Sequence, residues 1–323
     1  MRQSRRDLML MPVLACGLAA PALAMSAVTL VVPFSPGGSA DLAAHALARH
    51  LPALLPGQPA ITVENRAGAS GAVGTLSVAR AAPDGRVLLL ARVGSSAILP
   101  ATDTRTPFAW DDFTFLGLLD QNPYVIAVRA DAPWADLEAL VSALRDAPGR
   151  LSFATSGPAT ILDLGVRQLF VAAGLELDAA TALVLRGGGD AVAALLAGQA
   201  QFIGNNLPDL VAGLRAGSLR ALAVSGTAAL PEFPAIPTMR QAGFPALEEL
   251  TGWSALAGPP GMATDVVAGL AAGLARLGQD PGWLAEVARQ GSQARLLSPE
   301  ATRAHIGAQV ALYRDLARRL GLA

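Results

Sequence analysis

Four glycine- or serine-rich loops have the composition of anion-binding loops. Each follows a short apolar run and precedes a segment with apolar residues at helical spacing. A helix N-terminus presents unpaired main-chain N–H groups and a partial positive charge, and glycine lets a ligand approach them closely. A single loop of this kind more often only caps its helix, but four in one chain favour a shared cleft for a carboxylate. The loops are Ser35–Ser39, Gly68–Gly71, Thr155–Thr160 and Arg186–Gly189.

Arg186 is the charged residue within these loops. At a strand end before two glycines, its guanidinium could make a charge-assisted hydrogen bond to a second ligand carboxylate. It could equally be a solvated loop arginine or half of an ion pair between two lobes.

Residues suited to catalysis or metal binding are sparse. Lysine is absent, so all 24 basic residues are arginine, and Schiff-base chemistry and the P-loop lysine are excluded. His45 and His50 do not share a helix face, and His305 is far along the chain, so no metal site is expected. An exported hydrolase using Ser156 or Ser39 is an alternative, but no histidine stands at a predicted strand end to act as base. We expect a binding protein without cofactor or catalytic residues.

Composition and charge narrow the class of protein. A chain of 323 residues with 52% hydrophobic residues is long enough for about two domains with sizeable cores. The formal net charge is −1 and no basic run follows the first residues, which argues against nucleic acid as a partner. Cys16 is the single cysteine, so no disulfide framework or thiolate metal site is available.

The first 24 residues have the pattern of a signal peptide. Arg5 and Arg6 precede an apolar run, and Ala22-Leu23-Ala24 has the small-x-small form of a cleavage site. The arginine pair resembles a twin-arginine signal, with general secretion as the alternative. A lipid anchor at Cys16 is a second alternative. We therefore expect a periplasmic protein.

Strand-like and helix-like segments alternate along the rest of the chain. This alternation is typical of an α/β protein with parallel sheets, in which ligands bind beyond the carboxyl ends of the strands. The predicted strands are 28–33, 61–63, 87–91, one or two within 115–128, 151–154, 183–185, 202–204 and 219–225; the predicted helices include 41–55, 72–82, 134–146, 190–197 and 302–320, and residues 230–245 read as a proline-rich loop.

Several motifs in order resemble one receptor family. Residues 31–41 (VVPFSPGGSAD) and 63–71 (VENRAGASG) resemble the two signatures of the tripartite tricarboxylate transporter receptors, also called Bug-type solute-binding proteins. Segments 79–85 (ARAAPDG), 219–225 (LRALAVS) and 236–245 (IPTMRQAGFP) follow at the spacing of that family. The resemblance extends from about Val28 to Leu322.

The resemblance implies a type II periplasmic-binding fold, with two α/β lobes of mixed sheets joined by a two-crossing hinge that closes on a ligand. Lobe 1 would comprise residues 25–127 and 253–323, and lobe 2 residues 128–252. The partners implied are a small carboxylated ligand and separate membrane permease subunits. Some members report instead to a sensor kinase, which is an alternative role. We expect a monomer.

In this family the first-lobe loop and the loop matching 155–160 hold a ligand carboxylate, largely through main-chain amides and bridging waters. The loops and the resemblance together give the candidate ligand-binding residues Phe34, Ser35, Gly37, Gly38, Ser39, Asp41, Ala69, Ser70, Thr155, Ser156, Gly157, Thr160, Arg186, Gly187 and Asn205.

This sequence departs from the family pattern in the second lobe. The family loop usually reads Ser-Gly-x-Gly-Ser with a histidine three residues later, whereas Ala159, Thr160 and Asp163 stand here. Leu185 replaces the usual tyrosine before Arg186, and Asn205 replaces a common aspartate. The first-lobe loop is intact, so the sequence predicts carboxylate capture and leaves the ligand open among di- and tricarboxylates, amino acids and aromatic acids.

Overall fold

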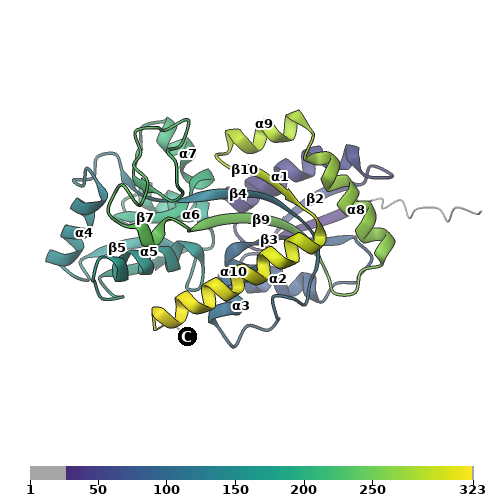
Figure 1. Cartoon of the computed structure of the whole chain (residues 1–323), viewed down its shortest axis with the longest axis horizontal. Coiled ribbons are helices and arrows are strands. Elements are labelled where there is room, and N and C mark those ends of the chain that lie inside the picture. The colour runs from purple at the N-terminus through teal and green to yellow at the C-terminus, as the bar shows by residue number, and fades with distance from the viewer. Residues whose placement is uncertain (1–26, 322–323) are drawn as a thin grey trace, which may run out of the picture.

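The structure is a computed structural model that describes residues 27–321. The predicted signal peptide, with Cys16, lies outside the described residues. Within them, ten strands form one continuous mixed sheet that passes through two α/β halves (Figure 1). None of the helices in this part of the chain combines the length and the apolar character that a membrane span requires.

Lobe 1 is built on three parallel strands, in the order β2 (Ala60–Asn65), β1 (Ala27–Val32) and β3 (Val87–Arg92). β1 is almost entirely apolar and five of its six residues are buried or half-buried, as expected for a strand covered on both faces. The helices of lobe 1 are α1 (Ser39–His50), α2 (Ala72–Ala79), α3 (Leu99–Thr102), α8 (Thr264–Leu277) and α9 (Pro281–Arg289). Short 3-10 or π turns lie at Pro52–Leu54, Ala69–Gly71 and Gly94–Ile98.

Lobe 2 repeats this arrangement with β7 (Phe202–Asn206), β5 (Leu151–Thr155) and β6 (Ala180–Val184), which are parallel. β8 (Leu219–Val224) joins the same sheet through an antiparallel pairing. The helices are α4 (Leu137–Asp146), α5 (Ile161–Ala172), α6 (Gly188–Leu196) and α7 (Leu207–Arg215), and a 3-10 turn lies at Pro245–Leu247.

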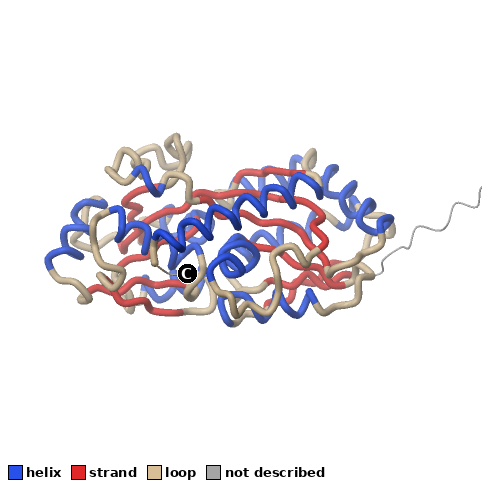
Figure 2. The backbone as a smooth tube through the Cα atoms, turned by 60° about the horizontal axis from the view of Figure 1, so that its bottom comes forward, coloured by secondary structure: helices blue, strands red, loops and turns tan. Residues whose placement is uncertain are grey.

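Two long strands connect the lobes. β4 (Thr114–Arg129) pairs with β9 (Thr251–Gly258) up to Pro123 and with β7 and β8 from Tyr124 onward. Both strands run across the middle of the molecule in Figure 1. These changes of partner lie close to the lobe boundaries expected from the sequence, which we retain as a proposal. The last strand, β10 (Gln293–Leu297), pairs with β4, and α10 (Pro299–Arg319) runs diagonally toward lobe 2 (Figures 1 and 2).

The predicted fold class, two α/β lobes with mixed sheets, is confirmed. The parallel pairing that strand–helix alternation indicated holds within each lobe, and antiparallel pairs are added to it. β3 and β9, β4 and β9, and β4 and β7 are antiparallel pairs. The segment 115–128 is one continuous strand, whereas β9 and β10 were not predicted. β9 reads TGWSALAG, and its small residues have weak strand propensity, so its conformation depends on pairing with β3 and β4 on both sides.

Candidate functional site

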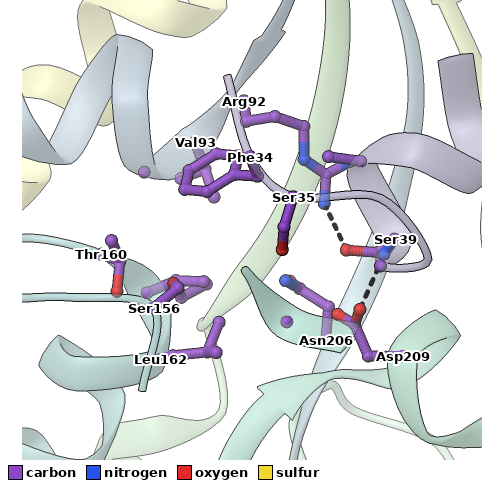
Figure 3. Close-up of a pocket in the computed structure, with 15 residues that line it drawn as sticks. Phe34, Ser35, Ser39, Arg92, Val93, Ser156, Thr160, Leu162, Asn206 and Asp209 are labelled. Carbon is purple, nitrogen blue, oxygen red and sulfur yellow. Dashed lines mark hydrogen bonds between the residues drawn. The ribbon is translucent and has the colours of Figure 1, made fainter. Parts of the chain in front are cut away.

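A small cavity lies between the lobes, beyond the carboxyl ends of the parallel strands, where the alternation of strands and helices predicts a ligand site. Its volume is about 30 Å³, which is enough for one or two water molecules. Figure 3 shows side chains from both lobes converging on it. The lining residues are Phe34, Ser35, Gly38, Ser39, Ala40, Arg92, Val93 and Gly94 from lobe 1 and Ser156, Thr160, Ile161, Leu162, Gly188, Asn206 and Asp209 from lobe 2.

The start of α1 is the first of two helix N-termini at this cavity. Gly38 is the N-cap, and no side chain from the loop itself caps the helix. Instead, the Ser39 N–H donates to Asp209 Oδ1 over 2.7 Å. Asp209 lies in the first turn of α7, so a carboxylate of lobe 2 reaches across to a helix N-terminus of lobe 1.

Arg92 lies behind Ser39 at the end of β3 and is only 4% exposed. Its Nη2 donates to Ser39 Oγ over 3.1 Å (Figure 3). Its Nη1 donates to Ser254 Oγ over 2.5 Å. Burial lowers the pKa of Arg92, against the opposing effect of Asp120 and Asp209. Burial also raises the pKa of both carboxyls, while Arg92 acts to lower it. The group therefore places one buried cation beside two carboxyls, of which Asp120 is buried and Asp209 is half-buried.

The start of α5 is the second helix N-terminus. Thr160 is the N-cap, but its Oγ1 donates to the Gly157 carbonyl over 2.7 Å and does not cap the helix. Ala159 has a φ of 58°, which is uncommon for alanine and shows how sharply the loop turns before the helix. With no side-chain cap, the N–H groups of the first turn of α5 are suited to an anion.

The two lobes touch on both sides of the cavity. The Ser35 N–H donates to the Arg186 carbonyl over 3.2 Å, and Ser70 Oγ donates to the Pro158 carbonyl over 2.6 Å. The start of α6 also approaches the first-lobe loop, because a Cβ added at Gly189 would lie 2.8 Å from the Gly37 carbonyl carbon. A ligand larger than water therefore requires the lobes to move apart before it can enter.

Six of the residues expected from the sequence line the cavity: Phe34, Ser35, Gly38, Ser39, Ser156 and Thr160. Gly37 and Asp41 shape the loop beside it, since the Gly37 N–H donates to Asp41 Oδ2 over 2.9 Å and Gly37 has a φ of 82°. Gly187 is packed against Ser35 at the lobe contact.

The remaining expected residues lie elsewhere. Ala69 and Ser70 border a separate outer hollow, together with the altered residues Ala159 and Asp163; Asp163 is paired with Arg167 at 2.8 Å. Thr155 and Gly157 bond to each other beneath the second-lobe loop.

Arg186 is exposed, and it is its main-chain carbonyl that contacts lobe 1. Asn205 is fully buried, and its Nδ2 donates to the Gly188 carbonyl over 3.3 Å, which fixes the start of α6.

Sequence reasoning missed Arg92, Asn206 and Asp209. Arg92 ends an apolar run, Leu88 to Ala91, at the strand end where parallel sheets place ligands, and that position is a usable signal. The sequence signal for Asp209 is weaker: it is an acidic residue in the first turn of a helix that follows a short strand. Its role depends on a contact with Ser39, which lies 170 positions away in the sequence.

The geometry offers little to a serine hydrolase. Ser39 Oγ is hydrogen-bonded to Arg92, which is not a general base. The three histidines contact Asp41, Glu286 and the Trp253 ring, and they do not line the cavity.

Comparisons with known proteins agree on a family. A family model described as tripartite tricarboxylate transporter family receptor matches residues 43–322. BugT of Bordetella pertussis is 31% identical over 314 residues, covering 94% of this chain and 94% of BugT. The solved structure of periplasmic binding protein BugD superimposes with a TM-score of 0.86 at 28% identity, covering 91% of this chain and 97% of BugD. MatC from Rhodopseudomonas palustris with bound malate gives a TM-score of 0.84 at 26% identity, covering 90% of this chain and 98% of MatC.

The two-lobed mixed fold, the loop motifs and these matches lead to one conclusion: the chain belongs to the tripartite tricarboxylate transporter receptor family, as a Bug-type solute-binding receptor.

Proposed function

We propose that this receptor binds a small carboxylate in the cavity between its lobes, in the periplasm, and delivers it to a separate membrane permease of the tripartite tricarboxylate type. The observation that carries the proposal is the convergence of two helix N-termini, those of α1 and α5, on one cavity lined by both lobes. Main-chain N–H groups at helix starts bind carboxylates without needing a positively charged partner.

Capture requires a change in the distance between the lobes. The cavity of about 30 Å³ is too small for a dicarboxylate. Among the described residues, the chain passes between the lobes in β4 and at the start of β9. Bending near Pro123 and Thr251, where β4 and β9 pass between the lobes, would widen the cavity and leave each sheet intact. Ligand binding would then favour closure because contacts from both lobes form only in the closed state.

The ligand class draws support from a relative. MatC, which shares the fold over nearly its whole length, was solved with bound malate. We extend to this chain the coarse feature, a small organic acid. Delivery to a permease is supported by the family description.

The proposal is tested by calorimetric titration of the purified protein with malate, succinate, glutarate, β-alanine, 4-aminobutyrate and benzoate, after a thermal-shift screen of the same acids. A ligand that binds only the folded protein stabilises it by about 2.7 kcal/mol at 100 times its dissociation constant. We expect at least one acid to bind with a single site per chain.

Substitution of Gly94 tests whether the ligand binds in this cavity. A Cβ at Gly94 would lie 3.7 Å from Phe34 and from Thr160, at the cavity between the lobes. Gly94→Phe should fill the cavity and abolish binding, whereas the matched control Gly94→Ala makes only ordinary contacts and should retain it. Binding that survives in Gly94→Phe would place the ligand outside this cavity and contradict the proposal.

Transport is a separate readout. Cells that express the permease should take up the identified acid only when they also export this receptor, and equal uptake without the receptor would contradict the delivery role.

A further inference from the structure

Asp209 occupies the position at α1 where the sequence predicts a ligand carboxylate. It projects from the first turn of α7 in lobe 2, and its Oδ1 accepts the Ser39 N–H at 2.7 Å. Figure 3 shows this bond continuing through Ser39 to Arg92. The protein thus supplies its own carboxylate to one of the two helix N-termini at the cavity.

The second oxygen of this carboxylate is buried without a partner. Asp209 Oδ2 has almost no exposed surface and no hydrogen-bond partner within 3.5 Å among the described residues, although Asp209 lines the cavity. The side chains of Ser39 and Asn206 are close enough to act against the rise in the Asp209 pKa, but neither makes a full hydrogen bond to Oδ2. Ser35 Oγ, at the same cavity, is likewise buried and unpartnered. The Ser35 hydroxyl can donate or accept, whereas a carboxylate oxygen can only accept. A buried acceptor without a donor is costly, so a ligand that brings a donor to Asp209 Oδ2 would gain affinity.

The surrounding charges favour a donor that is positive. Arg92 interacts electrostatically with both Asp120 and Asp209, so one buried cation faces two carboxyl groups, of which Asp120 is buried and Asp209 is half-buried. A second ligand carboxylate placed beside Asp209 would bring a third acidic group next to one cation. It would also compete with Asp209 for the Ser39 N–H, which already donates to Oδ1. An ammonium group would instead bond to Oδ2 and balance the excess acid.

We propose that Asp209 is a specificity-determining residue, which replaces a ligand carboxylate at the start of α1 and selects a ligand with one carboxylate and one amino group. The ligand carboxylate then binds at the start of α5, where Thr160 leaves the helix without a side-chain cap, and the amino group binds Asp209 Oδ2. This inference rests on the proposed function and narrows its ligand class to aminocarboxylates.

The test uses pairs of acids of equal length in which an amino group replaces one carboxylate: succinate with β-alanine, and glutarate with 4-aminobutyrate. Calorimetric titration at pH 7 measures the affinity ratio within each pair for three proteins. These are the wild type, Asp209→Asn, which keeps the shape and removes the charge, and Asp190→Asn. Asp190 is the matched control because it lies in the first turn of the neighbouring helix α6 and does not line the cavity.

We expect the wild type to prefer the amino acid of at least one pair, and Asp209→Asn to lower that ratio by about ten- to a hundredfold, the range for losing a charge-assisted hydrogen bond. Asp190→Asn should leave the ratio within about threefold, because the half-buried Asp190 does not line the cavity and its charge does not face the ligand. Wild-type preference for the dicarboxylate in both pairs overturns the proposal, and this arm needs no variant to fold. An unchanged ratio in a folded Asp209→Asn, or an equal change in Asp190→Asn, also overturns it.

The specificity role of Asp209 and the carboxylate-receptor function predict different negative results. If the dicarboxylates bind and the ratio does not depend on Asp209, the specificity role fails and the carboxylate receptor stands. If no protein binds any of the four acids and the wider panel is also negative, the proposed function fails, and the specificity role fails with it.

Discussion

The N-termini of α1 and α5 face the same cavity, yet their polar groups have different hydrogen-bond partners. At α1, the Ser39 N–H already donates to a carboxylate from the opposite lobe and Ser39 Oγ accepts from Arg92. At α5, Thr160 turns its hydroxyl back to the Gly157 carbonyl, and no side chain caps the helix. The intact first-lobe motif is therefore the more occupied of the two sites, and the altered second-lobe loop is the more open one.

The two helix starts therefore have different roles, although the sequence predicts carboxylate binding at both. α1 serves as an interlobe contact, because its polar partners come from both lobes and include the buried Arg92. α5 is left to receive the ligand carboxylate. Substitutions on the two sides should accordingly differ: loss of Arg92 beside α1 should mainly lower stability, whereas changes at Thr160 before α5 should mainly lower affinity.

The largest effect is expected for Arg92→Leu. Removing the guanidinium takes the charged donor from Ser39 Oγ and Ser254 Oγ and the neighbouring cation from Asp120 and Asp209, and each hydrogen bond to a charged group is worth about 1.5–3 kcal/mol. Denaturant unfolding should report this loss. Arg295→Leu is the control, since Arg295 is exposed and bonds to Gln121, and it should change stability by at most about 0.5 kcal/mol. Equal effects of the two substitutions would remove Arg92 from the account.

Gly189→Ala tests the approach of the lobes. The added Cβ would lie 2.8–3.0 Å from main-chain atoms of Gly37 and Gly38, which cannot rotate away as a side chain would. We expect ligand affinity to fall about tenfold or more, equivalent to 1.4 kcal/mol. The unliganded fold should hold, because alanine is favoured over glycine within a helix by about 1 kcal/mol.

The control for closure is Gly269→Ala, where a Cβ meets no atom within 4 Å. It should bind ligand as the wild type does. Undiminished affinity in Gly189→Ala would show that ligand binding does not require α6 to reach the first-lobe loop.

Thr160→Ala addresses the α5 side alone. The lost hydroxyl bond to the Gly157 carbonyl holds the loop that begins the helix, and its removal should cost about 1 kcal/mol of binding free energy. Thr160→Ser retains the hydroxyl and should restore most of the affinity. Titration of both variants decides the matter: a serine variant as weak as the alanine variant would assign the effect to the methyl group.

The smallest effect is expected for Arg186→Ala. The side chain is exposed and the interlobe contact is made by the main-chain carbonyl, so affinity for every acid in the panel should change by less than about 0.5 kcal/mol. A tenfold loss confined to dicarboxylates would contradict this expectation and revive the sequence-based role of Arg186 as a second carboxylate ligand.

Elements that depend on local sequence signals could be predicted, whereas elements that depend on contacts between distant residues could not. β1, β5 and α1 were visible in the sequence because apolar periodicity and glycine-rich turns are local signals. β9 was not, since its small residues become a strand only between β3 and β4. The same division holds in the site: Ser39 and Thr160 follow from loop chemistry, whereas the bond from Asp209 to Ser39 depends on how two lobes meet.

Arg186 and Asn205 show the opposite failure. Both occupy strand ends, where ligands bind in this class of sheet, but the turn directs the Arg186 side chain outward and Asn205 is used to hold α6. The sequence predicts where a residue lies along a strand, but the direction of its side chain at a turn depends on tertiary packing.

A crystal structure of the protein with its tightest-binding acid would show where the ligand carboxylate lies. We expect the ligand between the lobes, with a carboxylate oxygen within hydrogen-bond distance of main-chain N–H groups in the first turn of α5 and with further contacts from lobe 1. A ligand bound to one lobe alone, or with its carboxylate away from the starts of both α1 and α5, would contradict the account.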